Sequence, residues 1–482
     1  MKTARCLGVY VGHDEISSNK KNWIDKKGNI EGLLNSWKHR KLSIFGKVTI
    51  IKTLALSKLS YMALNFVTPD IIFKDLDKLF YNFLWYKRER IKRNTLIGNL
   101  ANGGIQMMDV ESHFNALKAS WVAKIINHES SSLHIGKAII NNFAKDKLLL
   151  KMNSTDITYL DEIPPFYKQV LVGYFKSDTS RKPETQKEIL NEVIWGNKHI
   201  RRQVRKIDNT FMFNNWISKD IIYIKDLKFT NGKLDEIFIY NKITDKRNIL
   251  CEIYTLNKAL HKYKDIIGTI IPKLYINKKN DIIPKESKYY YKKIVTHKIQ
   301  KPSYKLIKET FPNINEEEIM QTNILKVKCI KDKQIAEFNY KVINNILICN
   351  TYLSKWLPGI EETCIVCKRD SNLIHMVYEC INVKKTWISI GKMFNINIGI
   401  KEIILGLHED LSINYCICIM QFFIYKFWLL CIKNIEKYSP NNFKHFLINE
   451  IKFRICVMKH MKEKRNVENM KLIEKCIIDI KL

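Results

Sequence analysis

The sequence predicts a mainly α-helical, elongated protein with several domains. Its 482 residues are too many for one ordinary hydrophobic core. Its hydrophobic fraction of 46% and aromatic fraction of 11% are typical of folded globular chains. Apolar residues also recur every three or four positions through long stretches, which is the period of an amphipathic helix. We therefore expect an N-terminal helical bundle, a helical middle, a small Cys/His-rich module and a C-terminal helical tail.

The N-terminal bundle is predicted from four stretches with apolar residues on one helical face. These stretches cover residues 22–41, 43–66, 70–85 and 114–125. The second stretch is largely apolar and should end before Pro69, because proline disfavours helix in the residue before it. Basic residues follow the first and third stretches, at helix C-terminal ends, where the helix dipole favours cations.

The charge of the chain points to an anionic partner. Lysine and arginine total 81 against 48 acidic residues, a formal net charge of +33. Nucleic acid is the commonest partner of such a chain, and an anionic membrane is the second. An A+T-rich coding sequence would also raise the lysine content, so a helical bundle with solvated lysine faces stays an alternative. The candidate nucleic-acid contacts are Arg40, Lys41, Lys47, Lys52, Arg88, Arg90, Lys92, Arg93, Arg201 and Arg202.

The middle of the chain, residues 126–300, is rich in lysine and lacks a sharp pattern. Between residues 195 and 206, helical spacing would place five cations on adjoining faces: Lys198, Arg201, Arg202, Arg205 and Lys206. The segment 286–293 interleaves three tyrosines with lysines. Tyrosines can stack on unpaired bases while lysines follow the phosphates, so this composition suits single-stranded nucleic acid. The alternative is a solvated amphipathic helix or strand.

Three cysteines and one histidine stand close together in the order Cys-x2-Cys-x7-His-x4-Cys. A Cys-x2-Cys turn brings two thiolates to one ion. His375 and Cys380, five residues apart on a predicted helical turn, supply two more ligands from one face. The sequence therefore predicts a structural zinc site with the ligands Cys364, Cys367, His375 and Cys380. The alternative is three unrelated thiols and a chance histidine.

The remaining cysteines are typical of a reduced, intracellular protein. Most of them stand singly in apolar stretches, and no apolar run follows the basic N-terminus as in a signal peptide. We expect a nuclear and cytoplasmic location and no membrane partner. The apolar segment 415–432 approaches the length of a membrane span, but Gln421 and Lys426 interrupt it, which favours a buried helix. Cys416 and Cys418 lack a nearby second pair of ligands and are predicted to lie in the core.

Short motifs in a fixed order resemble a known family. They are "CLGVYVGHD" (6–14), "LSIFGK" (42–47), "FLW" (83–85), "GGI" (103–105), "ALKASW" (116–121), "IPPFYKQVL" (163–171), "IWGNKHI" (194–200) and "AEFNYKVINNIL" (336–347). The Cys/His spacing and Trp387 after it continue the pattern. Together they resemble the region after the polymerase palm in LINE-type, non-LTR retrotransposon reverse transcriptases. Cys6 stands where the family usually has an aromatic residue.

The resemblance implies a division into four segments. Residues 1–125 would be a primer-grip remnant and a thumb-like helical bundle, and residues 126–300 a lysine-rich helical middle. Residues 301–400 would form a wrist-like helical region with a zinc knuckle at 364–380, and residues 401–482 a helical tail. The family's aromatic-x-Asp-Asp hairpin would lie upstream of Met1, and the chain contains no Asp-Asp pair. We therefore expect no polymerase activity, since that chemistry needs carboxylates to hold two Mg²⁺ ions.

The function implied is RNA and DNA binding by the C-terminal portion of such an enzyme. Its partners would be the RNA template, the DNA primer or target, and the upstream polymerase and endonuclease domains of an intact element. One alternative is a stand-alone zinc-dependent nucleic-acid-binding protein derived from a transposon. Another is a truncated, non-functional relic.

Overall fold

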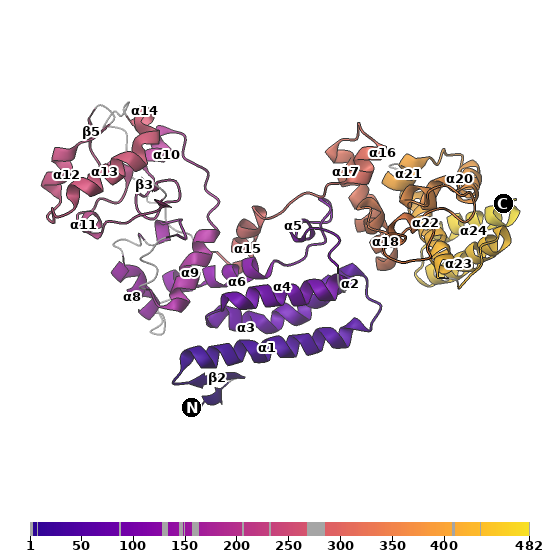
Figure 1. Cartoon of the computed structure of the whole chain (residues 1–482), viewed down its shortest axis with the longest axis horizontal. Helices are drawn as coiled ribbons and strands as arrows, with labels where there is room; N and C mark the ends of the chain where they lie inside the picture. The colour runs from indigo at the N-terminus through magenta and orange to yellow at the C-terminus, as the bar shows by residue number, and fades with distance from the viewer. Residues whose placement is uncertain are drawn as a thin grey trace. The chain divides into compact units, whose positions relative to one another are not determined.

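The computed structural model is mainly α-helical, as the sequence predicts, with a few short strands (Figure 1). It describes residues 3–481 apart from 7, 86–87, 128–133, 144–147, 149, 157–162, 205–206, 231–232, 268–284, 407–409 and 434. The chain divides into two compact units. Unit 1 consists of residues 1–33, 55–79 and 108–298, and unit 2 of residues 34–54, 80–107 and 299–482.

The two units do not follow the four consecutive segments expected from the sequence. Residues 80–107, expected in the N-terminal bundle, belong to the same unit as residues 299–482. The expected C-terminal tail, residues 401–482, also lies within unit 2. A compact unit is defined by which faces bury one another, and segments far apart in the sequence can do this as readily as neighbours.

In the residues that the structure describes, unit 1 combines helices with three short pairs of strands. Its elements are β1 (Thr3–Cys6), β2 (Val9–Gly12), α1 (Glu15–Lys38), α3 (Ser57–Asn65), α4 (Asp70–Trp85), α6 (Val110–Ala119), α7 (Trp121–Asn127), α8 (His134–Phe143), α9 (Pro165–Lys176), α10 (Gln186–Leu190), β3 (Arg202–Val204), β4 (Ile207–Asn209), α11 (Asn214–Ile217), η5 (Ile224–Asp226), β5 (Phe229–Thr230), β6 (Lys233–Leu234), α12 (Glu236–Lys242), α13 (Ile249–Leu260), η6 (His261–Tyr263), α14 (Lys264–Ile267) and α15 (Ser287–Thr296). The last residues of α1 and α4 belong to unit 2. Each strand pair is antiparallel, with register partners Cys6 and Val9 at the end of the first hairpin.

The predicted apolar faces of the N-terminal helices are buried. Trp23 and Ile30 of α1 have almost no exposed surface, and the Trp23 indole donates to the Val67 carbonyl over 2.9 Å. Helices α6 and α9 approach closely at Gly173, where a Cβ atom would lie 2.4 Å from the Asn115 carbonyl oxygen. The helical periodicity read from the sequence is thus confirmed for this part of the chain.

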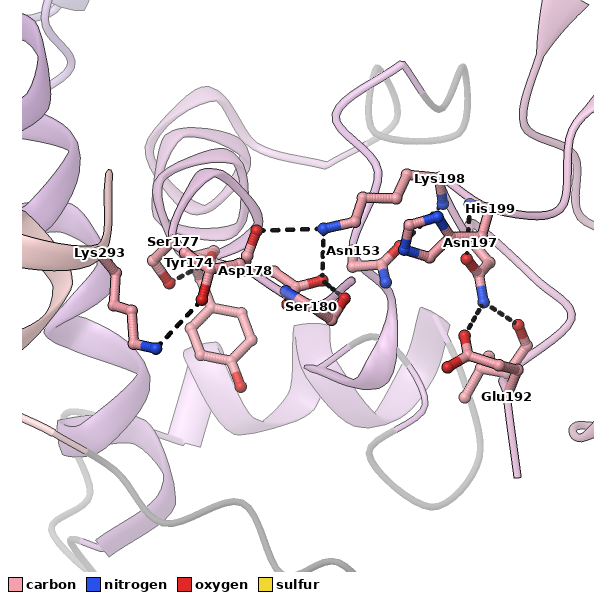
Figure 2. Close-up of polar contacts among 12 residues, drawn as sticks. Asn153, Tyr174, Ser177, Asp178, Ser180, Glu192, Asn197, Lys198, His199 and Lys293 are labelled. Atoms are coloured by element: carbon pink, nitrogen blue, oxygen red, sulfur yellow. Dashed lines mark hydrogen bonds and ion pairs between the residues drawn. The ribbon is translucent and has the colours of Figure 1, made fainter. Parts of the chain in front are cut away.

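The segment 194–200 of unit 1 is fixed in place by polar contacts (Figure 2). Asn197 donates to the Glu192 carboxylate over 2.6 Å and to the Val193 carbonyl over 2.8 Å. The Lys198 ammonium bonds both the carboxylate and the carbonyl of Asp178, each at 3.1 Å. These buried or half-buried contacts explain why polar residues stand between apolar ones in this motif.

The prediction that the basic residues between 195 and 206 lie on adjoining faces of a helix is wrong. Arg202 begins strand β3, which pairs with β4, so the cations of residues 198–202 do not share helix faces. The positions 205–206 lie outside the described residues. Arg201, directly before β3, pairs with Asp208 of β4 at 2.8 Å.

Unit 2 holds the C-terminal helices. Its elements are α2 (Ile44–Ile50), η1 (Ile51–Leu56, shared with unit 1), α5 (Arg93–Leu96), α16 (Lys305–Thr310), α17 (Glu316–Asn323), η7 (Ile324–Lys328), α18 (Lys333–Ile343), α19 (Asn350–Leu353), η8 (His375–Glu379), α20 (Ile381–Phe394), α21 (Ile400–Leu405), α22 (Leu411–Ile432), α23 (Pro440–His460) and α24 (Lys464–Asp479). The segments η1, η7 and η8 are π-helical. The predicted 43–66 helix is therefore present as α2, η1 and α3 in succession.

Helix α22 forms the core of unit 2 and contacts η7, η8, α18, α21, α23 and α24 (Figure 1). It is the one helix in the described part of the chain that is long and apolar enough to cross a membrane. Of its apolar 18-residue stretch, 72% is buried inside the protein. Gln421 is buried, and Lys426 pairs with Glu450 of α23 at 2.5 Å. Its apolar character is accounted for by packing inside the unit. Cys416 and Cys418 lie in this core, as predicted.

The Gly103-Gly104 pair fits a close approach in unit 2. Gly103 has a φ of +79°, and a Cβ atom there would lie 2.1 Å from the Tyr304 hydroxyl. The Gly103 carbonyl accepts a hydrogen bond from Tyr340 over 3.0 Å. At Gly104, a Cβ atom would lie 2.0 Å from the Gly98 carbonyl oxygen. Both glycines are therefore required for the close packing of the backbone at this point.

Candidate metal centre and basic surface

The four predicted ligands converge on one point in unit 2. One ligand atom each from Cys364, Cys367, His375 and Cys380 lies within 4.8 Å of the other three. The Cys364 and Cys380 sulfurs are 4.0 Å apart, and the Cys367 sulfur lies 3.1 Å from His375 Nε2. A tetrahedral ion with bonds of about 2.0–2.3 Å would separate its ligand atoms by roughly 3.5–3.8 Å. The donor set and its spacing could hold a metal ion and are compatible with zinc.

A short hairpin positions the first two cysteines. Cys364 donates its backbone N–H to the Arg369 carbonyl over 2.7 Å, and an isolated bridge pairs Thr363 with Asp370. The Val366 N–H points to the Cys364 sulfur at 3.4 Å. Lys368 takes a left-handed conformation with a φ of +54°, which reverses the chain after Cys367. Backbone N–H groups directed at a sulfur favour its thiolate form.

The other two ligands are brought together by a π-helical turn. The Cys380 N–H donates to the His375 carbonyl over 2.9 Å, a bond between residues five apart. Such a bond closes one π-helical turn, so His375 and Cys380 lie on the same face. In an α-helix, residues five apart point in different directions. The x4 spacing therefore matches the local helix type, and both side chains are buried.

A buried tryptophan is hydrogen-bonded to the π-helical turn that holds two of the ligands. Trp387 of α20 has no exposed surface, and its indole N–H donates to the Val377 carbonyl over 2.9 Å. Val377 lies in η8, between the two ligands of that turn. Trp387 thus packs against the segment that holds His375 and Cys380, and its burial leaves no face for stacking on a base.

The thiols influence one another's protonation. The hydrogen bond shared with Cys380 lowers the pKa of the Cys364 thiol. The same bond, with burial, raises the pKa of Cys380. A divalent ion would supply the charge needed to deprotonate both.

The predicted cations near the end of α1 and in the next helices differ in exposure. Arg40 is exposed, and its guanidinium lies 4.1 Å from the Trp37 ring centre; Lys41 is also exposed. Lys47 is only 5% exposed, donates to the Leu84 carbonyl over 3.1 Å, and has its pKa lowered to about 8 by burial. Lys52 donates to the Gln106 carbonyl over 3.0 Å, and burial lowers its pKa. Lys47 therefore lies in the core, where its ammonium group is not accessible to a surface ligand.

The second basic stretch, residues 88–93, lies at the surface of unit 2. Arg88 and Arg90 are exposed, and Lys92 is exposed at the start of α5. Arg93 is half-buried and bonds Glu89 through both Nε and Nη2, with a shortest contact of 2.5 Å. The positive charge of Arg93 is largely matched locally, whereas the neighbouring cations face solvent.

The basic residues predicted in unit 1 fall into two kinds. Arg201 pairs with Asp156 at 2.6 Å and with Asp208 at 2.8 Å, so two carboxylates already neutralise it. Arg202 is exposed on β3. The tyrosine-rich 286–293 segment begins helix α15, where Tyr290 is buried and the Tyr291 hydroxyl accepts the Asp109 N–H over 3.2 Å. This segment therefore has the pattern of an amphipathic helix.

Two aromatic residues that sequence reasoning missed lie beside the exposed arginines. The Arg88 guanidinium is 4.6 Å from the Trp356 ring centre, and that of Arg90 is 5.6 Å from the Tyr352 ring centre. No pattern in the sequence relates these distant positions, so only the fold could bring them together.

No protein-family model matches the chain. The assignment of function therefore rests on the geometry of the cluster and of the cations around it.

Proposed function

We propose that this chain binds RNA and DNA through unit 2, with a structural zinc ion in the Cys/His cluster, as the C-terminal portion of a LINE-type reverse transcriptase. The observation that carries the proposal is the convergence of four soft or borderline ligands on one buried point of a strongly basic chain. A closed set of three thiolates and one imidazole leaves no open position, so the zinc would stabilise the fold and take no part in a reaction.

The surroundings of the cluster support a nucleic-acid partner. Arg88, Arg90 and Lys92 are exposed in the same unit as the cluster. Phosphate groups bind arginine and lysine, and guanidinium groups held over aromatic rings are pre-oriented for such contacts. The lack of an Asp-Asp pair in the chain is compatible with binding in the absence of polymerase chemistry.

The test is the salt dependence of binding by the purified, zinc-loaded chain. If about six phosphates are contacted, log K for a labelled RNA should fall with log salt at a slope of about −4. Fluorescence anisotropy between about 50 and 200 mM salt would measure this slope. A slope near zero, or no binding, would mean that the charge excess is a bias of composition and not a binding surface.

A pair of variants locates the surface. Changing Arg88 and Arg90 together to glutamine should reduce the slope by about 1.4, the contribution of two phosphate contacts on a single strand. Arg201→Gln is the matched control, because Arg201 already pairs with Asp156 and Asp208. An unchanged slope in the double variant would remove residues 88–93 from the proposed surface.

A further inference from the structure

Trp356 is an exposed tryptophan in a position that burial does not explain. Trp356 is 60% exposed. It lies in a turn after α19, where its backbone N–H donates to the Leu353 carbonyl over 2.9 Å. Large aromatic side chains are normally largely buried, so an exposed tryptophan next to further exposed apolar surface is informative. The next residue, Leu357, is 49% exposed, so the apolar surface extends beyond the indole.

Cations lie beside this indole and the neighbouring Tyr352 ring. The Arg88 guanidinium lies 4.6 Å from the ring centre. Arg90 lies over the neighbouring Tyr352 and is fixed by a 2.7 Å hydrogen bond from Nη1 to the Ile346 carbonyl. Lys355, directly before Trp356, is exposed. We name this set, comprising Arg88, Arg90, Tyr352, Lys355 and Trp356, the Trp356 platform.

The platform is attached to the Cys/His cluster. Asn350 of α19 donates to the Thr363 carbonyl over 3.3 Å, and the Thr351 N–H donates to the Ser371 carbonyl over 3.4 Å. Thr363 directly precedes the ligand Cys364, and Ser371 follows the hairpin. A metal ion that fixes this hairpin would therefore also fix the short helix α19, which carries Tyr352 and leads into Trp356.

Two acidic residues lie near the platform, in the loop that follows Trp356. Glu361 and Glu362 are exposed on the same loop, and Glu362 accepts a hydrogen bond from Ser354 over 3.0 Å. The platform combines three cations with two aromatic rings, and the carboxylate of Glu89, between Arg88 and Arg90 in the sequence, is paired with Arg93 at 2.5 Å. This combination provides an anion contact and a stacking surface a few ångströms apart.

We infer that the Trp356 platform binds an unpaired nucleobase of a single-stranded nucleic acid, with the base stacked on Trp356 and the adjoining phosphates bound by Arg88, Arg90 and Lys355. Base–aromatic stacking tolerates any base, because every base has a π face, and arginines and lysines follow the backbone. In a duplex the bases are already stacked on each other, so the indole gains no comparable contact. This inference rests on the proposed function and names the form of nucleic acid that the unit selects.

The experiment compares the affinities of the full, zinc-loaded chain for single-stranded RNA, single-stranded DNA and a duplex of matched sequence. Trp356→Ala should weaken binding of both single strands by about 5- to 150-fold, the range expected for one stacked base, and leave duplex binding within about twofold. Trp356→Phe, which keeps an aromatic face, should recover part of the loss. Phe453→Ala on α23 is the matched control, since Phe453 is also an exposed aromatic residue of unit 2 and is not among the platform residues.

A second measurement is independent of the affinities. Single strands carrying 5-iodouracil should crosslink on irradiation to a peptide containing Trp356, and mass spectrometry would locate the site. A crosslink at this residue supports the inference, whereas crosslinks confined to other peptides contradict it.

The outcomes separate the two proposals. If the wild-type chain binds single strands with a salt-dependent affinity that Trp356→Ala leaves unchanged, the platform inference fails and the proposed function stands. Equal losses for single strands and duplex would also overturn the inference, because the indole would then not distinguish unpaired bases. If the wild-type chain binds none of the three nucleic acids, both proposals fail.

Discussion

Replacing Cys380 with serine should weaken metal binding and destabilise unit 2 beyond the Cys/His cluster itself. Cys380 ends η8 and directly precedes α20. Segment η8 contacts α22, and α20 contacts α24, so the ligand joins two elements of the core. A serine hydroxyl remains protonated at neutral pH and is a poor replacement for a thiolate on zinc. The three remaining ligands would hold the ion more weakly, and the two elements would lose their fixed junction.

The size of the effect follows from linkage between binding and folding. An ion that binds only the folded chain adds about 4 kcal/mol of stability when its free concentration is about 1,000 times Kd. In a unit of about 150–250 residues, each kcal/mol changes Tm by about 2–4 °C. The Tm of unit 2 should therefore fall by about 8–16 °C in Cys380→Ser. Unit 1 contains none of the four ligands, so its transition should stay in place.

Elemental analysis and calorimetry together provide the assay. The wild-type chain should purify with one equivalent of zinc and show a lower Tm for unit 2 after chelation. Cys431→Ser is the control, because Cys431 is a buried thiol of α22 that is not among the ligands, and this variant should keep its zinc. A wild-type chain without zinc, or a Cys380→Ser variant with a full equivalent, would refute the four-ligand site.

Three other predictions concern buried groups and catalysis. Burial lowers the pKa of Lys118 to about 7. Between about pH 7 and 10 the unfolded chain therefore binds one proton more than the folded chain. The free energy of unfolding should rise with pH in this range, by up to about 1.4 kcal/mol per pH unit. Urea unfolding at several pH values should show this rise in the wild type and its loss in Lys118→Met, whereas Lys78→Met, at an exposed site, should keep it. Trp387→Ala should destabilise unit 2 by about 3–5 kcal/mol and weaken zinc binding, as measured by denaturation and competition with a chelator; an effect below about 1 kcal/mol would contradict the supporting role of the indole. The purified chain should incorporate no nucleotides on a primed RNA template with Mg²⁺, and incorporation above that of a mock preparation would contradict the expectation.

Much of the local structure was determined by the sequence alone. The apolar spacing in residues 22–41 and 70–85 predicted helices α1 and α4, because burial of one face requires the helical period. The Cys/His spacing predicted a cluster, which the fold brings within 4.8 Å, because the ligands are close in sequence and two tight turns suffice to join them. Short-range features of this kind depend on neighbouring residues, which a pattern in one chain records directly.

Only the tertiary structure decided which cations face solvent and which segments share a core. Lys47 and Arg201 look like Arg88 in the sequence, but the first is bonded inside unit 2 and the second is held between two carboxylates. Arg88 meets Trp356 because the chain folds back across more than half of its length. Exposure and such pairings depend on contacts between segments far apart in the sequence, and no local spacing encodes those contacts.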